Sequence, residues 1–463
     1  MDSGAGEHAE DGEHATFGIG WLWRAGGKTR RMRGEFDHVR TPDNERKWLA
    51  YPAIAVRDDA SITGLICSGE MREASQDWDR RDSILSNWLD FGIPRFPMVR
   101  SVTHSSSRSD PATICVFLPN WVGDVIMATP TLRTLRHRFP APTRIIGVMR
   151  PYVAQVLAGT HWLDEQLLWD RHSNKPELRS KGLIPVLQAL RPNMAITLTN
   201  SFHSAWAAWR SGARERIGYS RNLRAFLLNN RPAAPRNGWR LRPWSAVDQY
   251  LTLAQAAGCD ISNRQLQLAT LPGDESGAER AWQELGLTGQ RVVAVNIGSA
   301  TSPARVWPQE SVEQLCRELV TDSTTSVLLL CGPKERADVA AIEQRVGHPR
   351  VVSMADQDLS LGVSKAVICR SHALVTTDSG PRHIAAAFTI PTVTMFGPTD
   401  PAWSVNYSPV ERWLYRDLPC RPCNKKQCPL VHQACLRELS VSQVLDAIRT
   451  LPSPAPLTNA RAG

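Results

Sequence analysis

The stretch LVTTDSGPRHIAAA, residues 374–387, joins an apolar run to a helical pattern through a short turn. Residues 373–377 are apolar or β-branched and predict a buried strand, and residues 382–388 predict a helix. Pro381 suits the first helical position, where its missing N–H is not needed, and Gly380 lets a ligand approach the backbone closely. A helix start of this kind offers free N–H groups and a positive dipole end to a phosphate. The stretch therefore predicts a strand–turn–helix unit with an anion site at its turn.

Outward from this unit, apolar runs bounded by glycine and proline alternate with helical stretches. Such alternation is typical of parallel sheets covered on both faces, and two such sets, joined near Leu271-Pro272-Gly273, predict two Rossmann-like domains facing each other across a cleft. In that architecture ligands bind at the carboxyl ends of the strands. The expected strands are 114–118, 144–148 and 194–198 in the first set and 292–297, 327–331 and 392–396 in the second, with helices at 125–138, 309–321 and 335–346.

Residues 1–100 lack sustained periodicity, and only short pieces such as 53–56 resemble strands. The Ser-rich segment at 101–111 is typical of a polar linker. One hypothesis is that residues 1–97 are an irregular extension dispensable for function, or upstream sequence wrongly joined to the reading frame. Equal activity of a chain beginning at Met98 would support it, and loss of folding would contradict it. The expected limits are 1–105 for this extension and linker, 106–272 for the first domain, 273–452 for the second and 453–463 for a tail.

The composition is that of an ordinary globular protein, with 463 residues, 42% hydrophobic and 21% charged. The net charge of +9 is uneven, because residues 1–100 carry −3 and residues 101–463 carry +12. This excess indicates an anionic partner (phosphates, nucleic acid or an anionic membrane surface) or merely an Arg-rich proteome, since only 8 of the 54 basic residues are lysine. No stretch approaches the roughly 18 consecutive apolar residues of a membrane helix, and the acidic N-terminus has no signal-peptide core. We expect a cytoplasmic protein.

Ten cysteines are too few for a disulfide scaffold in a chain of this length. Six are scattered in mostly apolar surroundings and are expected to be reduced core thiols: Cys67, Cys115, Cys259, Cys316, Cys331 and Cys369. The other four, Cys420, Cys423, Cys428 and Cys435, fall within 16 residues. They could bind a structural zinc ion, but the spacing is not the paired CxxC pattern, and we favour no bound metal.

The loops after the expected strands hold the candidate site residues. The loop before Asp124 has a single glycine and is not the dinucleotide fingerprint, so NAD binding is discounted. Asp124 is either a helix N-cap or a general base in the cleft, and it can be both. Arg382 and His383 oppose the helix dipole unless an anion lies at the helix start.

Two further residues at the expected strand ends have both a plain and a functional interpretation. Glu335 is an acidic first-turn residue or an acceptor for a ribose diol. Arg305 is a surface cation or a phosphate ligand.

Together these segments resemble glycosyltransferase family 9, the ADP-heptose:lipopolysaccharide heptosyltransferases, and most of all its heptosyltransferase II branch. The resemblance covers about residues 113–450, in the order found in the family, and leaves residues 1–100 outside. Its motifs are LPNWVGDVIMATPTLRTLR (118–136), TNSFHSAWAA (199–208), RIGYSRNLRAFLL (216–228), SPARVWP (302–308), CGPKE (331–335), TTDSGPRHIAAA (376–387) and FGPTDP (396–401).

The resemblance implies a GT-B fold, with the acceptor on the N-terminal domain and the nucleotide-sugar on the C-terminal one. Asp124 matches the catalytic base that deprotonates the acceptor hydroxyl. Glu335 falls near the carboxylate that meets the adenosine ribose, and Arg305 stands where the family usually has lysine in a phosphate-contacting loop. The other matched donor-side residues are Thr301, Asp378, Ser379, Gly380 and His383, and the acceptor-side ones are Asn120, Ser201 and His203.

The implied reaction is an inverting transfer of heptose from ADP-heptose to the lipopolysaccharide inner core, without a catalytic metal or other cofactor. We expect a monomer that touches the inner membrane transiently at its cytoplasmic face. One alternative is another GT-B transferase with an ADP- or UDP-sugar donor and a different glycan acceptor. A more distant one is a basic nucleic-acid-binding protein, which the dispersed tryptophans and missing reader motif disfavour.

Overall fold

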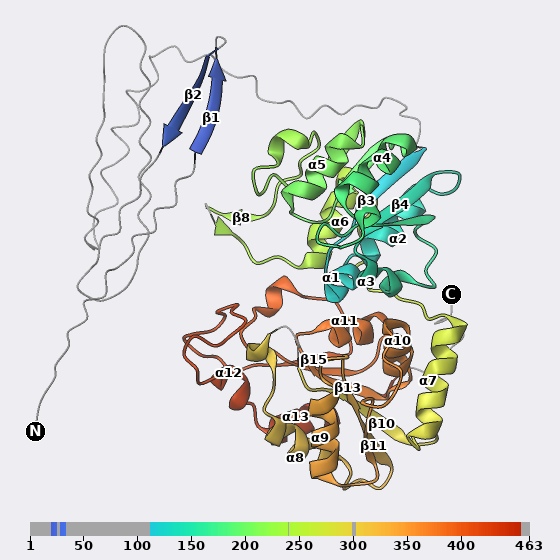
Figure 1. Cartoon of the computed structure of the whole chain (residues 1–463). Coiled ribbons are helices and arrows are strands. Elements are labelled where there is room, and N and C mark those ends of the chain that lie inside the picture. Colours follow the sequence, from blue (N-terminus) through green and yellow to red (C-terminus); the bar gives the residue numbers. More distant parts are fainter. Residues whose placement is uncertain (1–19, 26–27, 34–111, 239, 299–301, 455–463) are drawn as a thin grey trace, which may run out of the picture. The chain divides into compact units, whose positions relative to one another are not determined.

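The computed structural model describes residues 20–25, 28–33, 112–238, 240–298 and 302–454 (Figure 1). The chain divides into two compact units, Met1–Thr103 and His104–Gly463. The described part of the first unit is an antiparallel hairpin of β1 (Gly20–Ala25) and β2 (Lys28–Arg33). The strand expected at 53–56, the role of the extension, and the candidate Thr301 lie outside the described residues.

The N-terminal half of the second unit is built on a parallel sheet of five strands in the order β5-β4-β3-β6-β7. In its central strand, Ile114 and Val116 pack into one core cluster and Cys115 and Phe117 into another, so both faces are buried. This is the pattern that a continuous apolar run predicts for a parallel sheet. The strands are β3 (Thr113–Phe117), β4 (Arg144–Met149), β5 (Glu165–Leu168), β6 (Met194–Thr197) and β7 (Glu215–Ile217).

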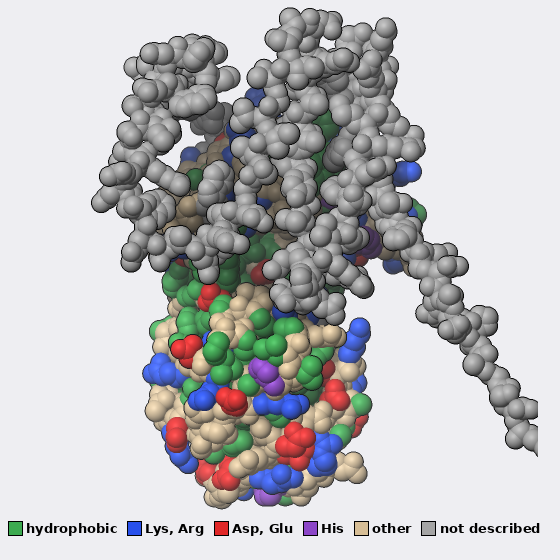
Figure 2. Space-filling model, turned by 90° about the vertical axis from the view of Figure 1, so that its left-hand side faces the viewer, with side chains coloured by type: hydrophobic (Ala, Val, Ile, Leu, Met, Phe, Trp, Pro, Cys, Tyr) green, Lys and Arg blue, Asp and Glu red, His purple; other side chains and the backbone are tan. Residues whose placement is uncertain are grey.

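The C-terminal half has a parallel sheet of six strands in the order β12-β11-β10-β13-β14-β15. Its strands are β10 (Arg291–Asn296), β11 (Thr325–Leu330), β12 (Val351–Ser353), β13 (Ala373–Thr377), β14 (Thr392–Met395) and β15 (Glu411–Leu414). On the face of this domain that Figure 2 shows, basic and acidic side chains are interspersed. The predicted fold class, two parallel α/β domains facing a cleft, is confirmed.

Helices cover both sheets (Figure 1). In the N-terminal half they are α1 (Val122–Met127), α2 (Thr129–Arg138), α3 (Pro151–Ala154), α4 (Ser180–Leu190), α5 (Phe202–Arg210) and α6 (Ala246–Ala256). In the C-terminal half they are α7 (Pro272–Glu284), α8 (Gln309–Leu319), α9 (Arg336–Val346), α10 (Leu361–Arg370), α11 (Gly380–Ala387), α12 (Ala434–Arg437) and α13 (Val441–Arg449). Within the described part of the chain, none of the helices has the length and apolar character needed to cross a membrane.

One expectation about helix limits is wrong. The single helix expected at 125–138 is two helices, α1 and α2, which meet at Ala128 just before Pro130. Proline lacks the N–H that would continue the hydrogen-bond ladder across this point. The segment near which the two sets of strands were expected to join, Leu271-Pro272-Gly273, holds the N-cap and the first two residues of α7.

The two domains meet where α1 packs against α11, at the centre of Figure 1. A fully buried Lys365 on α10 reinforces the joint, because its Nζ donates to the carbonyl oxygens of Ala158 at 3.1 Å and Ala269 at 2.7 Å. Ser245 at the start of α6 donates to the carbonyl of Val405 at 2.7 Å. These contacts hold the carboxyl ends of both sheets around a common opening.

Candidate active site

A cleft of about 540 Å³ opens between the two domains at the ends of β3 and β13. It is lined by six of the predicted site residues: Asp124 from the N-terminal domain, and Arg305, Asp378, Ser379, Gly380 and His383 from the C-terminal one. Residues more than 250 positions apart in the chain therefore share one cavity.

Asp124 is the third residue of α1, and the N-cap position expected for it is occupied by Trp121. Among the described residues, none forms a hydrogen bond or ion pair with its carboxylate. Burial and, to a smaller extent, the negative charge of Asp378 raise the pKa of Asp124, and the charge of Arg305 opposes them; the net result is a pKa of about 6. The result is an unpaired carboxylate that is ionised at neutral pH and holds a proton more readily than an exposed one.

Asp378, on the opposite side of the cleft, is held by several partners. Its Oδ1 lies 3.3 Å from Nη1 of Arg382 and accepts from the Ser404 hydroxyl at 3.2 Å. Its Oδ2 lies 3.7 Å from Nη1 of Arg305. Burial alone would raise the pKa of Asp378, but the two guanidinium groups hold it below its ordinary value. Asp378 is therefore a fixed negative charge that orients its neighbours.

The place of Arg382 in the first turn suggested that it meets an anionic ligand at the helix start. In the structure it does not. Its side chain is fully buried and points to Glu411 on β15, with Nε–Oε1 and Nη2–Oε2 distances of 2.6 and 3.2 Å. The guanidinium carbon also lies 4.7 Å from the ring centre of Phe396. The carboxylate of Glu411 is thus the anion that offsets the unfavourable position of the Arg382 charge near the positive end of the helix dipole.

His383 lies at the contact between the two domains. A Cβ added to Gly123 would come within 2.8 Å of Cδ2 of His383, so the glycine allows α1 to rest on the imidazole ring. Burial and the nearby charge of Arg382 lower the pKa of His383 to about 4, so the ring is neutral at physiological pH. Its Nδ1 is buried and has no hydrogen-bond partner among the described residues.

The start of α11 faces the cleft with its backbone. The Ser379 hydroxyl is turned inward and donates to Oδ1 of Asn296 at the end of β10, at 3.1 Å. The N–H groups of the first helical turn have no partner within the helix. A Cβ on Gly380 would meet Val122 at an ordinary 3.6 Å, so the residue lies close to α1 without crowding it. These features leave a backbone anion site at this turn.

Arg305 closes the same side of the cleft. It ends a short 3-10 helix, and its Nη1 donates to the carbonyl of Asp378 at 3.1 Å. Its Nε is buried without a hydrogen-bond partner in the described part of the chain. Asn424 and Lys426 also line the cleft, although neither belongs to a motif that predicts a site residue.

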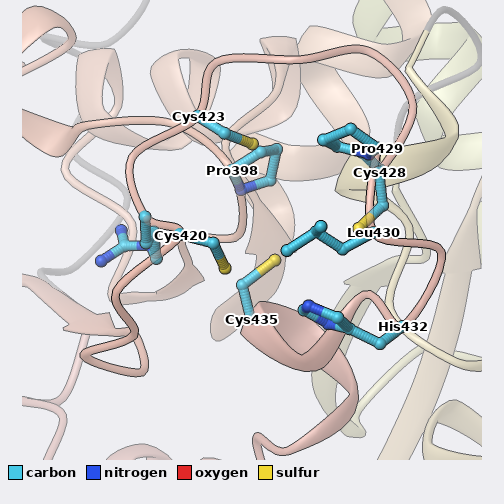
Figure 3. A pocket seen from close by; sticks show the side chains of 10 residues that line it. Pro398, Cys420, Cys423, Cys428, Pro429, Leu430, His432 and Cys435 are labelled. Carbon is cyan, nitrogen blue, oxygen red and sulfur yellow. The ribbon is translucent and has the colours of Figure 1, made fainter. Parts of the chain in front are cut away.

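A Cys-rich loop brings Asn424 and Lys426 to the cleft. The carbonyl of Lys426 accepts from the Ala304 N–H at 3.0 Å, and the N–H of Asn424 donates to the carbonyl of Pro398 at 2.8 Å. Figure 3 shows three cysteine side chains of this loop, together with Cys435 of α12, around Pro398 and Leu430, in a separate pocket with His432 at its edge. No group of three or more described His, Cys, Asp or Glu side chains is arranged to hold a metal ion, here or elsewhere.

Glu335 lies apart from the other donor-side residues, outside the lining of the cleft. It is the N-cap of α9, and its Oε2 accepts from the Gly332 N–H at 2.8 Å. The strand before it, β11, is next to β10 in the sheet, so Glu335 stands at the same sheet edge two strands from Asp378.

The acceptor-side residues lie at the carboxyl end of the N-terminal sheet. A cavity of about 160 Å³ there is lined by Asn120 and Ser201, with Arg171 and His172 beside them. Ser201 is also the N-cap of α5, its hydroxyl accepting from the His203 N–H at 3.2 Å. The imidazole of His203 is exposed and is outside the lining of this cavity. The structure thus brings two of the three predicted acceptor-side residues together.

A family model for "Glycosyltransferase family 9 (heptosyltransferase)" matches residues 184–433, which is more than half of the chain. The chain belongs to glycosyltransferase family 9. Lipopolysaccharide heptosyltransferase 2 of Escherichia coli (strain K12) is 27% identical over 303 residues, covering 62% of this chain and 83% of that protein. The family assignment made from the sequence motifs is therefore confirmed, and this family 9 chain is a heptosyltransferase.

Solved structures show that the heptosyltransferase has the GT-B arrangement. The E. coli ADP-heptose lipopolysaccharide heptosyltransferase II matches with a TM-score of 0.59 and 23% identity, over 73% of this chain and 97% of that one. The E. coli heptosyltransferase WaaC with ADP-2-deoxy-2-fluoro heptose matches with a TM-score of 0.54 and 19% identity, over 73% and 99%. At these identities the likeness shows the fold alone.

Proposed function

We propose that this heptosyltransferase transfers heptose from ADP-heptose to a hydroxyl of the lipopolysaccharide inner core, with inversion at the anomeric carbon. The observation that carries the proposal is that Asp124, a carboxylate without a partner among the described residues, shares one cleft with a backbone anion site at the start of α11. An inverting displacement needs a base on the acceptor side and a stabiliser of the leaving diphosphate on the other.

In the proposed step, the acceptor hydroxyl oxygen forms a bond to the anomeric carbon while its proton passes to Asp124. The bond from that carbon to the diphosphate breaks, and its electron pair leaves with ADP. A pKa of about 6 leaves Asp124 largely ionised at neutral pH while making it a stronger base than an exposed aspartate.

Positive groups of the chain stabilise the departing ADP. The first-turn N–H groups of α11 present the positive end of the helix dipole, and Arg305 and Lys426 line the same cavity. Arginine in place of the usual lysine at 305 keeps the charge, and its Nη1 contact to the Asp378 carbonyl fixes the guanidinium beside the diphosphate site. The proposal assigns no step to a metal ion.

The acceptor lies on the N-terminal domain in this scheme. The cavity with Asn120 and Ser201 also presents Arg171 and His172, which suit an acceptor carrying phosphates and carboxylates. The E. coli relative is named for lipopolysaccharide, and the solved WaaC structure holds an ADP-heptose analogue. By the same analogy the enzyme works at the cytoplasmic face of the inner membrane.

Calorimetric and thermal-shift titration of the full chain with ADP, ADP-heptose, UDP and UDP-glucose, in the presence of EDTA, tests the donor. We expect ADP and ADP-heptose to bind and raise Tm, and the UDP compounds to have no effect. Selective binding of UDP compounds would favour the alternative, a GT-B transferase with another donor. Chirality at the anomeric carbon of the product, read by NMR, tests inversion separately.

A further inference from the structure

A short loop after β7 presents large apolar side chains to solvent. Leu223 is 86% exposed and Phe226 is 74% exposed, and the Phe226 ring lies 6.2 Å from that of Phe202, which is 37% exposed. We call these three side chains the apolar patch. A cluster of this kind on a protein surface marks a site of interaction.

The loop is held rigidly in this position. Arg224 is fully buried, and its guanidinium donates to the carbonyl oxygens of Tyr219 at 2.9 Å and Ser201 at 3.3 Å, and to that of Thr199. Leu223 has a φ of 56°, in the left-handed region that bulky side chains avoid. The fold therefore holds Leu223 outward at the expense of backbone strain.

The surrounding segment is strongly basic. Residues 199–243 contain nine arginines and no lysine or aspartate, with a single glutamate, for a net charge of +8. Arg231 is exposed and reaches the loop, where its Nη1 lies 3.5 Å from the carbonyl of Ala225, whereas the exposed Arg210 and Arg214 lie at the other end of α5 from Phe202. This charge is most of the +12 that residues 101–463 carry. The interspersed charges on the face of the C-terminal domain in Figure 2 show no such bias.

The apolar patch is joined directly to the candidate acceptor cavity. Thr199 and Ser201 line that cavity, and their carbonyl oxygens accept from Arg224. Asn222 fastens the loop at the same point, its Nδ2 donating to the Asn200 carbonyl at 2.6 Å. A partner bound to the apolar patch would therefore lie next to the candidate acceptor cavity.

We propose that the apolar patch and its arginines dock the enzyme on an anionic lipid surface. Apolar side chains that enter the acyl boundary, ringed by cations that meet anionic headgroups, are the chemistry of interfacial binding. A second copy of the chain would place like charges of this size against each other, which disfavours self-association as the role of the patch. The inference rests on the proposed function, because a lipid-anchored acceptor is what makes docking beside this cavity useful.

Cosedimentation of the full chain with vesicles tests the docking. The vesicles contain phosphatidylethanolamine with phosphatidylglycerol, or phosphatidylcholine alone. We expect the wild type to bind the anionic vesicles, to release in high salt, and to bind the neutral ones weakly. The double variant Leu223→Ser/Phe226→Ser should bind the anionic vesicles about tenfold less.

Val431→Ser is the matched control. Val431 is 83% exposed with a φ of 63°, like Leu223, but belongs to the C-terminal domain. This variant should bind vesicles like the wild type. Equal vesicle binding by the double variant and the wild type would overturn the proposal, as would a concentration-dependent dimer in sedimentation velocity that the double variant loses.

Two further readouts separate this proposal from the proposed function. The double variant should keep wild-type affinity for ADP and wild-type transfer to a delipidated core oligosaccharide, and lose transfer only to acceptor embedded in vesicles. If the double variant and the wild type transfer heptose equally well to both acceptors, the docking proposal alone is overturned. Vesicle binding that depends on the patch, in a protein that uses no ADP-heptose, would overturn the proposed function instead.

Discussion

Two carboxylates face each other across the cleft and are treated in opposite ways by the fold. Asp378, from the C-terminal domain, is held by two arginines and a serine, and its pKa lies below the ordinary value. Asp124, from the N-terminal domain, has no partner among the described residues, and burial raises its pKa to about 6. Pairing with cations, and not residue type, therefore separates a structural carboxylate from one that can act as a base.

The largest expected effect is that of Asp124→Asn. Removing the base should lower kcat by about 10²–10⁴-fold while leaving ADP affinity unchanged in calorimetry. Because burial disfavours the ionised carboxylate, the free energy of unfolding of the wild type falls as pH rises from 3.8 to about 6. The Asp124→Asn variant has no such cost, so at neutral pH it should unfold at no lower temperature than the wild type.

The companion variant Asp378→Asn should behave in the opposite way. It removes the charge that Arg305 and Arg382 face, so Tm and ADP affinity should both fall. A pair of variants with the reverse pattern, in which Asp124→Asn unfolds easily and Asp378→Asn keeps its ADP affinity, would break the comparison.

The next effect concerns the buried pair that anchors the Asp378 side. Arg382→Met leaves Glu411 and Asp378 without their buried cation, and the free energy of unfolding in urea should fall by about 3–5 kcal/mol. Arg412→Met, an exposed arginine next to Glu411 on β15, is the control and should change the free energy of unfolding by no more than about 0.5 kcal/mol. Similar losses in the two variants would show that Arg382 is not an internal anchor.

A smaller effect is expected where the two halves touch. Gly123→Ala places a Cβ within 2.8 Å of the buried His383 ring, so one of the two must shift. We expect a loss of about 1–3 kcal/mol in unfolding free energy, with reduced transfer as α1 and α11 are pushed apart. Gly273→Ala, where the added Cβ meets no atom within 4 Å, should be neutral in the same measurements.

Much of the fold could be predicted from the sequence, because buried parallel strands are continuous apolar runs. The run at 373–377 is a strand with those limits, and residues 292–297 and 327–331 are strands shifted by one or two positions. Edge strands such as Glu165–Leu168 and Glu411–Leu414 were not predicted, since they are short and partly exposed. Their register depends on neighbours far away in the chain.

The site was predictable only where strand ends carry local motifs. Asp124 and the turn before His383 fall at such ends. Glu411, the partner of Arg382, could not be predicted, because it lies 29 residues further along the chain and follows no motif. Lys426 enters the cleft through backbone contacts of the Cys-rich loop to Ala304, which no sequence spacing indicates.

The most direct test is the pH dependence of kcat/KM for heptose transfer by the wild-type enzyme. Asp124 acts as a base only when ionised, so kcat/KM should be constant at high pH, bend near pH 6, and fall about tenfold per pH unit below the bend. The residual activity of Asp124→Asn should lack the bend. A flat profile in the wild type, or the same bend in the variant, would contradict the assignment of Asp124 as the base.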